Sequence, residues 1–187
     1  MAFTIQDFRG KALTNSGARA NLFEVEIHDV PTNTLSGTAV NEFMFTCKAA
    51  AIPAMAVGTI DVPYFGRTIK VPGNKTFDNW TVTIINDEGF HIRNGFEKWI
   101  AAMGSHADNI ATIGADFAGD GGSLYGSAIV QHYKKTSAAI AQAKYSFVNI
   151  FPVSIAEITL GWGENDAIEE FTVEFAYDYW LHEGVVT

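Results

Sequence analysis

The sequence predicts a mainly β protein, in which a two-sheet β-sandwich or barrel is flanked by one α-helix at about residues 90–103. Apolar and polar side chains alternate over residues 21–28 and again over residues 168–180. That period of two is typical of strands with one buried face. Apolar residues at 92, 96, 99, 100 and 103 follow helical spacing instead. Because strands with one apolar face have to cover it, we expect two packed sheets or a closed barrel.

The other elements are expected from shorter patterns along the chain. Extended structure is expected at residues 43–48, 80–85, 127–134, 145–151 and 153–160, with Pro152 separating the last two. Residues 136–143 suggest a turn or a short helical link, residues 161–166 a hairpin turn, and the small apolar residues 49–57 a tightly packed segment.

The helix is bounded by residues that commonly begin and end helices. Asn86 and Asp87 precede it and can cap its free N–H groups. Gly104 follows its last apolar residue and fits the C′ position. Gly95 lies inside the helix, where glycine costs up to about 1 kcal/mol relative to alanine, so we expect close packing there.

A projecting arm is expected at residues 60–71. Pro63 and Pro72 favour extended backbone in the residues before them, and Pro72-Gly73 fits a type II turn. Gly66 offers a second turn beside Tyr64 and Phe65. An arm with apolar side chains at its tip needs a surface to cover them, so we expect this chain to complete its fold against copies of itself.

The whole chain, residues 1–187, is expected to form a single domain. Residues 1–20 read either as an N-terminal arm, which Phe3, Ile5 and Phe8 could anchor to a neighbour, or as a loose tail. The glycine-rich residues 104–126 are expected to form a long surface loop. Residues 1–20 contain no continuous apolar run, so we expect no signal peptide. The apolar run at residues 49–57 is too short to span a membrane.

The composition limits the possible partners. The net charge is −9, and charged residues make up only 18% of the chain. A strongly acidic protein lacks the cation density that tight nucleic-acid binding requires. The low charged fraction favours extensive protein–protein contacts. The one cysteine, Cys47, is expected to be a buried thiol.

No catalytic, cofactor-binding or metal motif is found in the sequence. The five histidines form no pair at i, i+4, and none lies near the cysteine. Asp116 and Asp120 lack the ligand spacing of a calcium loop. The acidic residues of the strands could be read as the paired acids of a hydrolase, but we interpret them as solvated strand faces. We therefore expect no enzyme, no cofactor and no bound metal.

Several segments in a fixed order resemble the major tail tube proteins of contractile-tailed bacteriophages. The resemblance covers roughly residues 21–103 and 127–180. No single segment is diagnostic, but the number of matching segments and their order make the resemblance strong. These are NLFEVEI at 21–27, FTCKAAAIP at 45–53, Arg67-x-Ile69-x-Val71-x-Gly73, Thr76-Phe77-x-x-Trp80-x-Val82-Thr83, Asn86-Asp87, residues 96–99, Ser127-Ala128-x-Val130-x-x-Tyr133, Phe151-Pro152, and residues 171–180 with Asp178-Tyr179-Trp180.

The resemblance implies the phage tail tube fold and a structural role in the virion. Six protomers are expected in each ring, and stacked rings form a hollow tube inside a contractile sheath. The implied partners are other copies of the chain, the sheath protein, the baseplate or initiator protein and the tail terminator. Phage DNA is expected to pass through the lumen without specific binding. The protein is expected to be made and assembled in the host cytoplasm.

Two groups of residues are candidates for these roles. Contacts between subunits are expected from the tip of the arm and from the N-terminal arm, at Tyr64, Phe65, Gly66, Arg67, Phe3 and Phe8. An acidic lumen would repel phosphate and let DNA slide. Its candidates are Glu24, Glu26, Glu174 and Asp178, and the sequence leaves open which polar face lines the bore.

Three alternatives remain open at this point. The nearest is the tube of a phage-derived contractile device, such as a tailocin, an extracellular injection system or a type VI secretion system. A barrel that binds a small apolar ligand would need an apolar cavity inside a monomer. An enzyme is the third alternative.

Overall fold

The computed structural model describes residues 4–12, 17–31, 34–107, 124–135, 137–163 and 166–183. The described helices are α1 (Ile5–Asp7), a π-helix η1 (Phe8–Ala12), α2 (Gly37–Thr46) and α3 (His91–Met103). The described strands are β1 (Phe23–His28), β2 (Cys47–Ala50), β3 (Ala56–Tyr64), β4 (Arg67–Thr76), β5 (Trp80–Ile85), β6 (Gly126–Lys134), β7 (Ser137–Ile155), β8 (Glu170–Ala176) and β9 (Tyr179–His182). The mainly β prediction is confirmed.

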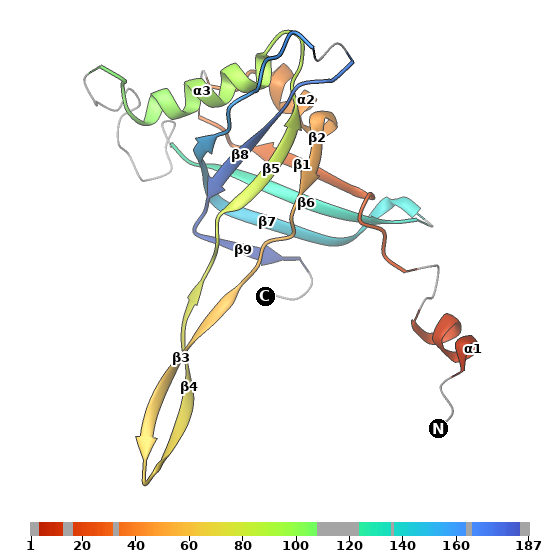
Figure 1. Ribbon diagram of the computed structural model, residues 1–187, viewed down its shortest axis with the longest axis vertical. Helices are drawn as coiled ribbons and strands as arrows, with labels where there is room; N and C mark the ends of the chain where they lie inside the picture. Colours follow the sequence, from red (N-terminus) through yellow and green to blue (C-terminus); the bar gives the residue numbers. More distant parts are fainter. Residues whose placement is uncertain are drawn as a thin grey trace.

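One long strand, β7, connects two sheet surfaces. The strand order is β1-β6-β7-β8-β5-β2, and β9 also pairs with β7. The first part of β7 pairs with β6 and β9, whereas residues 151–155 pair with β8. The β1-β6-β7-β9 surface and the β8-β5-β2 surface cross one another in Figure 1. We call them the first and the second sheet.

The core lies between these two sheets. Val25 and Ile27 of β1 are buried, as are Val82 and Val173 of the second sheet. Trp80 of β5 stacks on Phe147 of β7, with ring centroids 4.4 Å apart. The apolar faces of the two sheets therefore face each other, and their polar faces point outward in opposite directions.

The helix α2 corrects the prediction of extended structure at residues 43–48. Ser36 caps the helix, since its Oγ accepts a hydrogen bond from Ala39 N at 3.2 Å. Ala39 and Phe43, one turn apart, are both buried, and extended structure begins only at Cys47. A short apolar run such as residues 43–45 fits either a strand or a buried helix face, so the local pattern does not decide between them.

The helix α3 begins one residue later than predicted and ends where predicted. Asp87 satisfies its first N–H groups, accepting from His91 N at 2.9 Å. Gly104 ends the helix with extended backbone rather than the left-handed conformation of a C′ glycine. Close packing at Gly95 is confirmed, because a Cβ there would lie 2.8 Å from Leu35 Cγ.

Three predicted boundaries in the C-terminal half are wrong. Residues 137–143 belong to β7 rather than to a turn or helical link, and Pro152 lies within that strand instead of separating two strands. The predicted strand at residues 168–180 is two strands, β8 and β9, which pair with different partners. The long predicted loop falls largely on residues 108–123, and the predicted hairpin turn partly on 164–165, both outside the described residues.

Candidate assembly surfaces

The arm, which consists of β3, β4 and their connecting turn, is a two-stranded hairpin that projects from the sandwich (Figure 1). Its register runs from Ala56↔Thr76 to the last pair before the turn, Tyr64↔Arg67. Phe65 and Gly66 close it with φ values of 40° and 81°. A type I′ turn requires positive φ at both central residues. The structure thus has the turn expected at Gly66, in a hairpin longer than residues 60–71.

The predicted type II turn at Pro72-Gly73 is wrong, because β4 continues through both residues. In a hairpin with a two-residue turn, hydrogen-bonded pairs alternate outward from the turn. Pro63 pairs with Thr68 and Pro72 with Thr59, and both pairs are of the non-hydrogen-bonded kind. A missing N–H at these two positions therefore removes no ladder hydrogen bond. Gly73 permits a close approach, since a Cβ there would lie 3.1 Å from Gly58 O.

The two faces of the arm differ in chemistry. Residues paired in register point to the same face, and side chains alternate along each strand. One face is apolar apart from Arg67, and its large apolar members are 42–56% exposed. They are Ile60, Val62, Tyr64, Ile69 and Val71. The opposite face carries the Asp61–Lys70 ion pair at 3.4 Å. The arm is therefore an amphipathic ribbon whose apolar face is open to solvent.

The segment that leads into the arm is also exposed. Residues 49–57 were expected to be tightly packed, but Ile52, Met55 and Val57 are each about half exposed. This prediction is wrong for the single chain. These exposed apolar residues extend the uncovered apolar surface toward the sandwich.

Part of the N-terminal arm lies outside the described residues, including the candidate Phe3. The described part, α1 and η1, lies away from both sheets in Figure 1. Phe8 is 47% exposed and Ile5 is 77% exposed. Both apolar side chains are thus uncovered by the rest of this chain.

The four acidic candidates divide between the two outer faces. Glu24 and Glu26 alternate with buried residues of β1 and lie on the outer face of the first sheet. Glu174 lies between two buried residues of β8, on the outer face of the second sheet. Asp178 lies in the connection from β8 to β9 and accepts a hydrogen bond from Asn149 Nδ2 at 2.6 Å. Since the two outer faces point in opposite directions, these residues form no single acidic cluster.

The acidic side chains already have partners within the chain. The Tyr133 hydroxyl donates a hydrogen bond to Glu24 Oε2. This bond, together with burial and the negative charge of Glu24, raises the pKa of Tyr133 to about 12. His28 Nε2 lies 2.9 Å from Glu26 Oε2, and Asn79 Nδ2 donates to Glu174 Oε1 at 2.8 Å.

A barrel that binds a small apolar ligand would need an apolar cavity between the two sheets. Large aromatic side chains occupy the space between the sheets in the described part of the chain. Phe96 lies edge-on to Phe175 at 5.6 Å and to Phe43 at 6.0 Å. None of the described helices is long and apolar enough to cross a membrane.

Comparison with known proteins gives a consistent result. Residues 18–183 match the family described as phage tail tube protein. The chain is 34% identical to the tail tube protein of Enterobacteria phage T4 over 163 residues, which is 87% of this chain and 90% of that protein.

Two solved structures share the fold. A chain of the tube-terminating cap of the anti-feeding prophage has a TM-score of 0.64 at 16% identity, covering 98% of this chain and 99% of that chain. A chain from the sheath–tube complex of an extracellular contractile injection system has a TM-score of 0.57 at 14% identity, covering 98% and 100%. At these identities the likeness shows the fold alone and gives no preference for an injection device. The sequence match and the shared fold together show that this chain belongs to the phage tail tube protein family, on the branch of contractile-tailed phages.

Proposed function

We propose that this chain assembles into hexameric rings, which stack into the inner tube of a contractile tail through which phage DNA is ejected. The observation that carries this proposal is the exposed apolar face of the arm. An isolated two-stranded hairpin is at best marginally stable in water, and exposed apolar surface of this extent marks a contact site. Burial of that face against a neighbouring subunit would stabilise the hairpin and remove its apolar surface from water. The chain then performs no bond chemistry.

The outer face of the second sheet is our proposal for the lining of the bore. Thr81, Thr83 and Thr172 share this face with Glu174. Lys48 also reaches this face, but its charge is paired with Glu170 at 2.6 Å. The small hydroxyl side chains and the Glu174 carboxylate present no cation to DNA phosphate. The outer face of the first sheet is less suited to a bore, because Tyr179 and Leu181 are exposed there. Those two apolar side chains fit a surface that another protein covers.

The expected protein partners are supported by fold alone. The structural neighbours come from complexes described as a baseplate, a tube-terminating cap and a sheath–tube assembly. By analogy, the sheath, the baseplate or initiator and the terminator are the partners that we propose for this chain, which is a component of the virion. Assembly in the host cytoplasm belongs to the same proposal.

The assembly proposal is tested by two double variants of the arm. Val62→Thr with Ile69→Thr keeps β-branching but makes the apolar face polar. Asp61→Thr with Lys70→Thr changes the opposite face by the same number of residues. Negative-stain electron microscopy of the purified protein should show rings or tubes for the wild type and the second variant only. Tubes of normal length from the first variant would contradict a contact role for the apolar face.

The bore proposal is tested by reversing charge on each outer face. Glu174→Lys with Thr83→Lys would give each subunit two cations in the bore, so assembled tubes should retain DNA at low salt. The matched change on the other sheet, Glu24→Lys with Glu26→Lys, should leave DNA outside the bore. DNA retained by the second variant but not the first would assign the lumen to the first sheet.

A further inference from the structure

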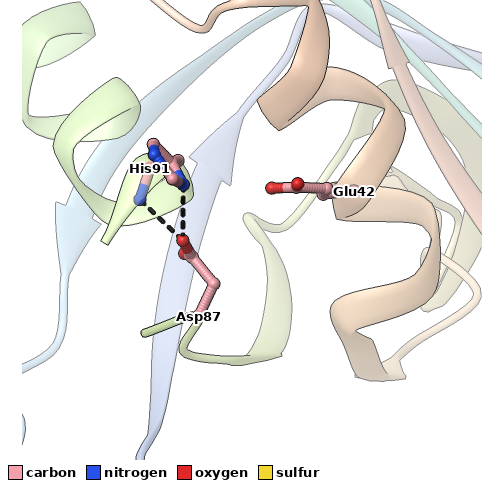
Figure 2. A group of neighbouring side chains, drawn as sticks. All are labelled: Glu42, Asp87 and His91. Atoms are coloured by element: carbon pink, nitrogen blue, oxygen red, sulfur yellow. Dashed lines mark hydrogen bonds and ion pairs between the residues drawn. The ribbon is translucent and has the colours of Figure 1, made fainter. Parts of the chain in front are cut away.

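Three potential metal ligands from separate parts of the sequence meet at the start of α3. Glu42 comes from α2, Asp87 from the connection between β5 and α3, and His91 is the first residue of α3. Their ligand atoms all lie within 4.8 Å of one another. Figure 2 shows the Glu42 carboxylate directed toward the Asp87–His91 pair. In the described part of the chain, these are the three potential ligand side chains that lie close enough together to share one metal ion.

Asp87 and His91 are held in place by the start of the helix. Asp87 Oδ2 accepts a hydrogen bond from His91 N at 2.9 Å and lies 2.9 Å from His91 Nδ1. Burial raises the pKa of Asp87, but hydrogen bonds from the backbone of His91 and Ile92 and from the His91 ring outweigh it and leave this pKa below its usual value. Gly89 makes room for the imidazole, because a Cβ there would lie 2.2 Å from His91 Cε1. The carboxylate and the ring are thus positioned before any ligand binds.

The Glu42 carboxylate has an unsatisfied oxygen atom at this site. Its Oε2 atom is buried from solvent and has no hydrogen-bond partner. Among the described residues, no lysine or arginine forms an ion pair with Glu42 or with Asp87. A buried carboxylate oxygen beside a second carboxylate is costly unless a cation compensates it. Within the described structure, the only ion-pair partner at the point where the three side chains converge is therefore the His91 ring, which is charged only when it is protonated.

We propose that Glu42, Asp87 and His91 bind one zinc-type divalent cation. Zinc accepts carboxylate oxygen and imidazole nitrogen at about 2.0–2.2 Å, so two of its ligands lie at most about 4.4 Å apart. Small side-chain rotations bring the observed group within that limit. An imidazole ligand favours zinc and related transition metals, whereas magnesium and calcium prefer all-oxygen sites. Water completes the coordination on the solvent side, where His91 is exposed.

The bound cation would connect two helices that the sequence places far apart. Glu42 belongs to α2, which also carries the buried Phe43, and His91 begins α3, whose Phe96 packs against that ring. A metal bridge would neutralise the repulsion between the two carboxylates at this contact. It would therefore stabilise the fold and take no part in catalysis.

Titration of the purified full-length chain with zinc tests the proposal. At pH 7, competition with a chromophoric chelator should show one zinc ion per chain, and zinc should raise the melting temperature. Glu42→Gln and His91→Gln should each weaken zinc binding at least tenfold and abolish the thermal shift. Circular dichroism without metal should show that each variant is folded, and we expect His91→Gln to fold because the His91 side chain is exposed.

The control variant is His28→Gln. His28 lies 2.9 Å from Glu26, the same separation as between His91 and Asp87, but no third ligand joins that pair in the described structure. Zinc binding should be unchanged in this variant. The proposal is overturned if the wild type binds no zinc at micromolar concentrations, if binding survives both site variants, or if His28→Gln abolishes it. Equal binding of magnesium would overturn the assigned metal class.

Discussion

Replacement of Phe65 by asparagine separates the role of the arm's tip in assembly from its role in the hairpin. Phe65 is 92% exposed and occupies the first central position of the type I′ turn, with φ of 40°. Asn-Gly is the preferred pair for that turn. Phe65→Asn should therefore preserve or stabilise the hairpin in the free subunit while it removes the aromatic ring.

The size of the effect follows from the area that Phe65 can still bury. Full burial of a phenylalanine side chain contributes about 1.5–3 kcal/mol. If a neighbouring subunit covers the ring, its loss weakens each contact roughly 10- to 150-fold. The critical concentration for tube formation, measured by sedimentation, should rise by about that factor. Phe65→Asp adds the cost of burying a charge and should leave soluble protein that does not polymerise.

The matched control is Phe65→Tyr, which keeps an aromatic ring at the tip and should assemble near the wild-type concentration. Unfolding of the unassembled subunits by urea shows whether Phe65→Asn has preserved the fold. Tubes from Phe65→Asn at the wild-type critical concentration would refute the contact that we infer for the tip.

The remaining predictions concern the fold itself. Gly95→Ala should lower the unfolding free energy by about 1–3 kcal/mol in urea titration through the clash with Leu35, whereas Asn94→Ala on the exposed side of α3 should change it by less than about 0.5 kcal/mol. Hydrogen bonds hold the pKa of Asp87 below its usual value despite burial, so its contribution to stability is complete above about pH 4 and is lost as the pH falls through the lower folded pKa. Asp87→Asn should therefore flatten the acid side of a stability–pH curve, and an unchanged slope would contradict this reasoning. Burial raises the pKa of the Cys47 thiol to about 12, so a disulfide reagent at pH 8 should modify it slowly in the folded protein and rapidly in urea.

Local sequence patterns that fit only one regular structure were sufficient to predict several elements. Strict alternation predicted β1, β5 and the buried face of β8, because a period of two fits no other regular structure. The stripe of apolar residues predicted α3 within one residue of its observed start. Gly66 beside two aromatic residues predicted the turn of the arm. The alternation over residues 60–71 also contains the apolar face of the arm.

Where a local pattern fits two structures, contacts between distant parts of the chain select one of them. Residues 43–45 are apolar and fit either a strand or a helix, and in the helix Phe43 packs against Phe96 of α3. Pro152 reads as a strand boundary, but β7 tolerates it at an irregular point of its pairing with β8. The outer faces that carry Glu24 and Glu174 point in opposite directions because the two sheets are stacked. That stacking depends on contacts between residues far apart in the chain, so no local pattern predicts it. The meeting of Glu42 with Asp87 and His91 depends on the same packing, so no spacing in the sequence could have predicted it.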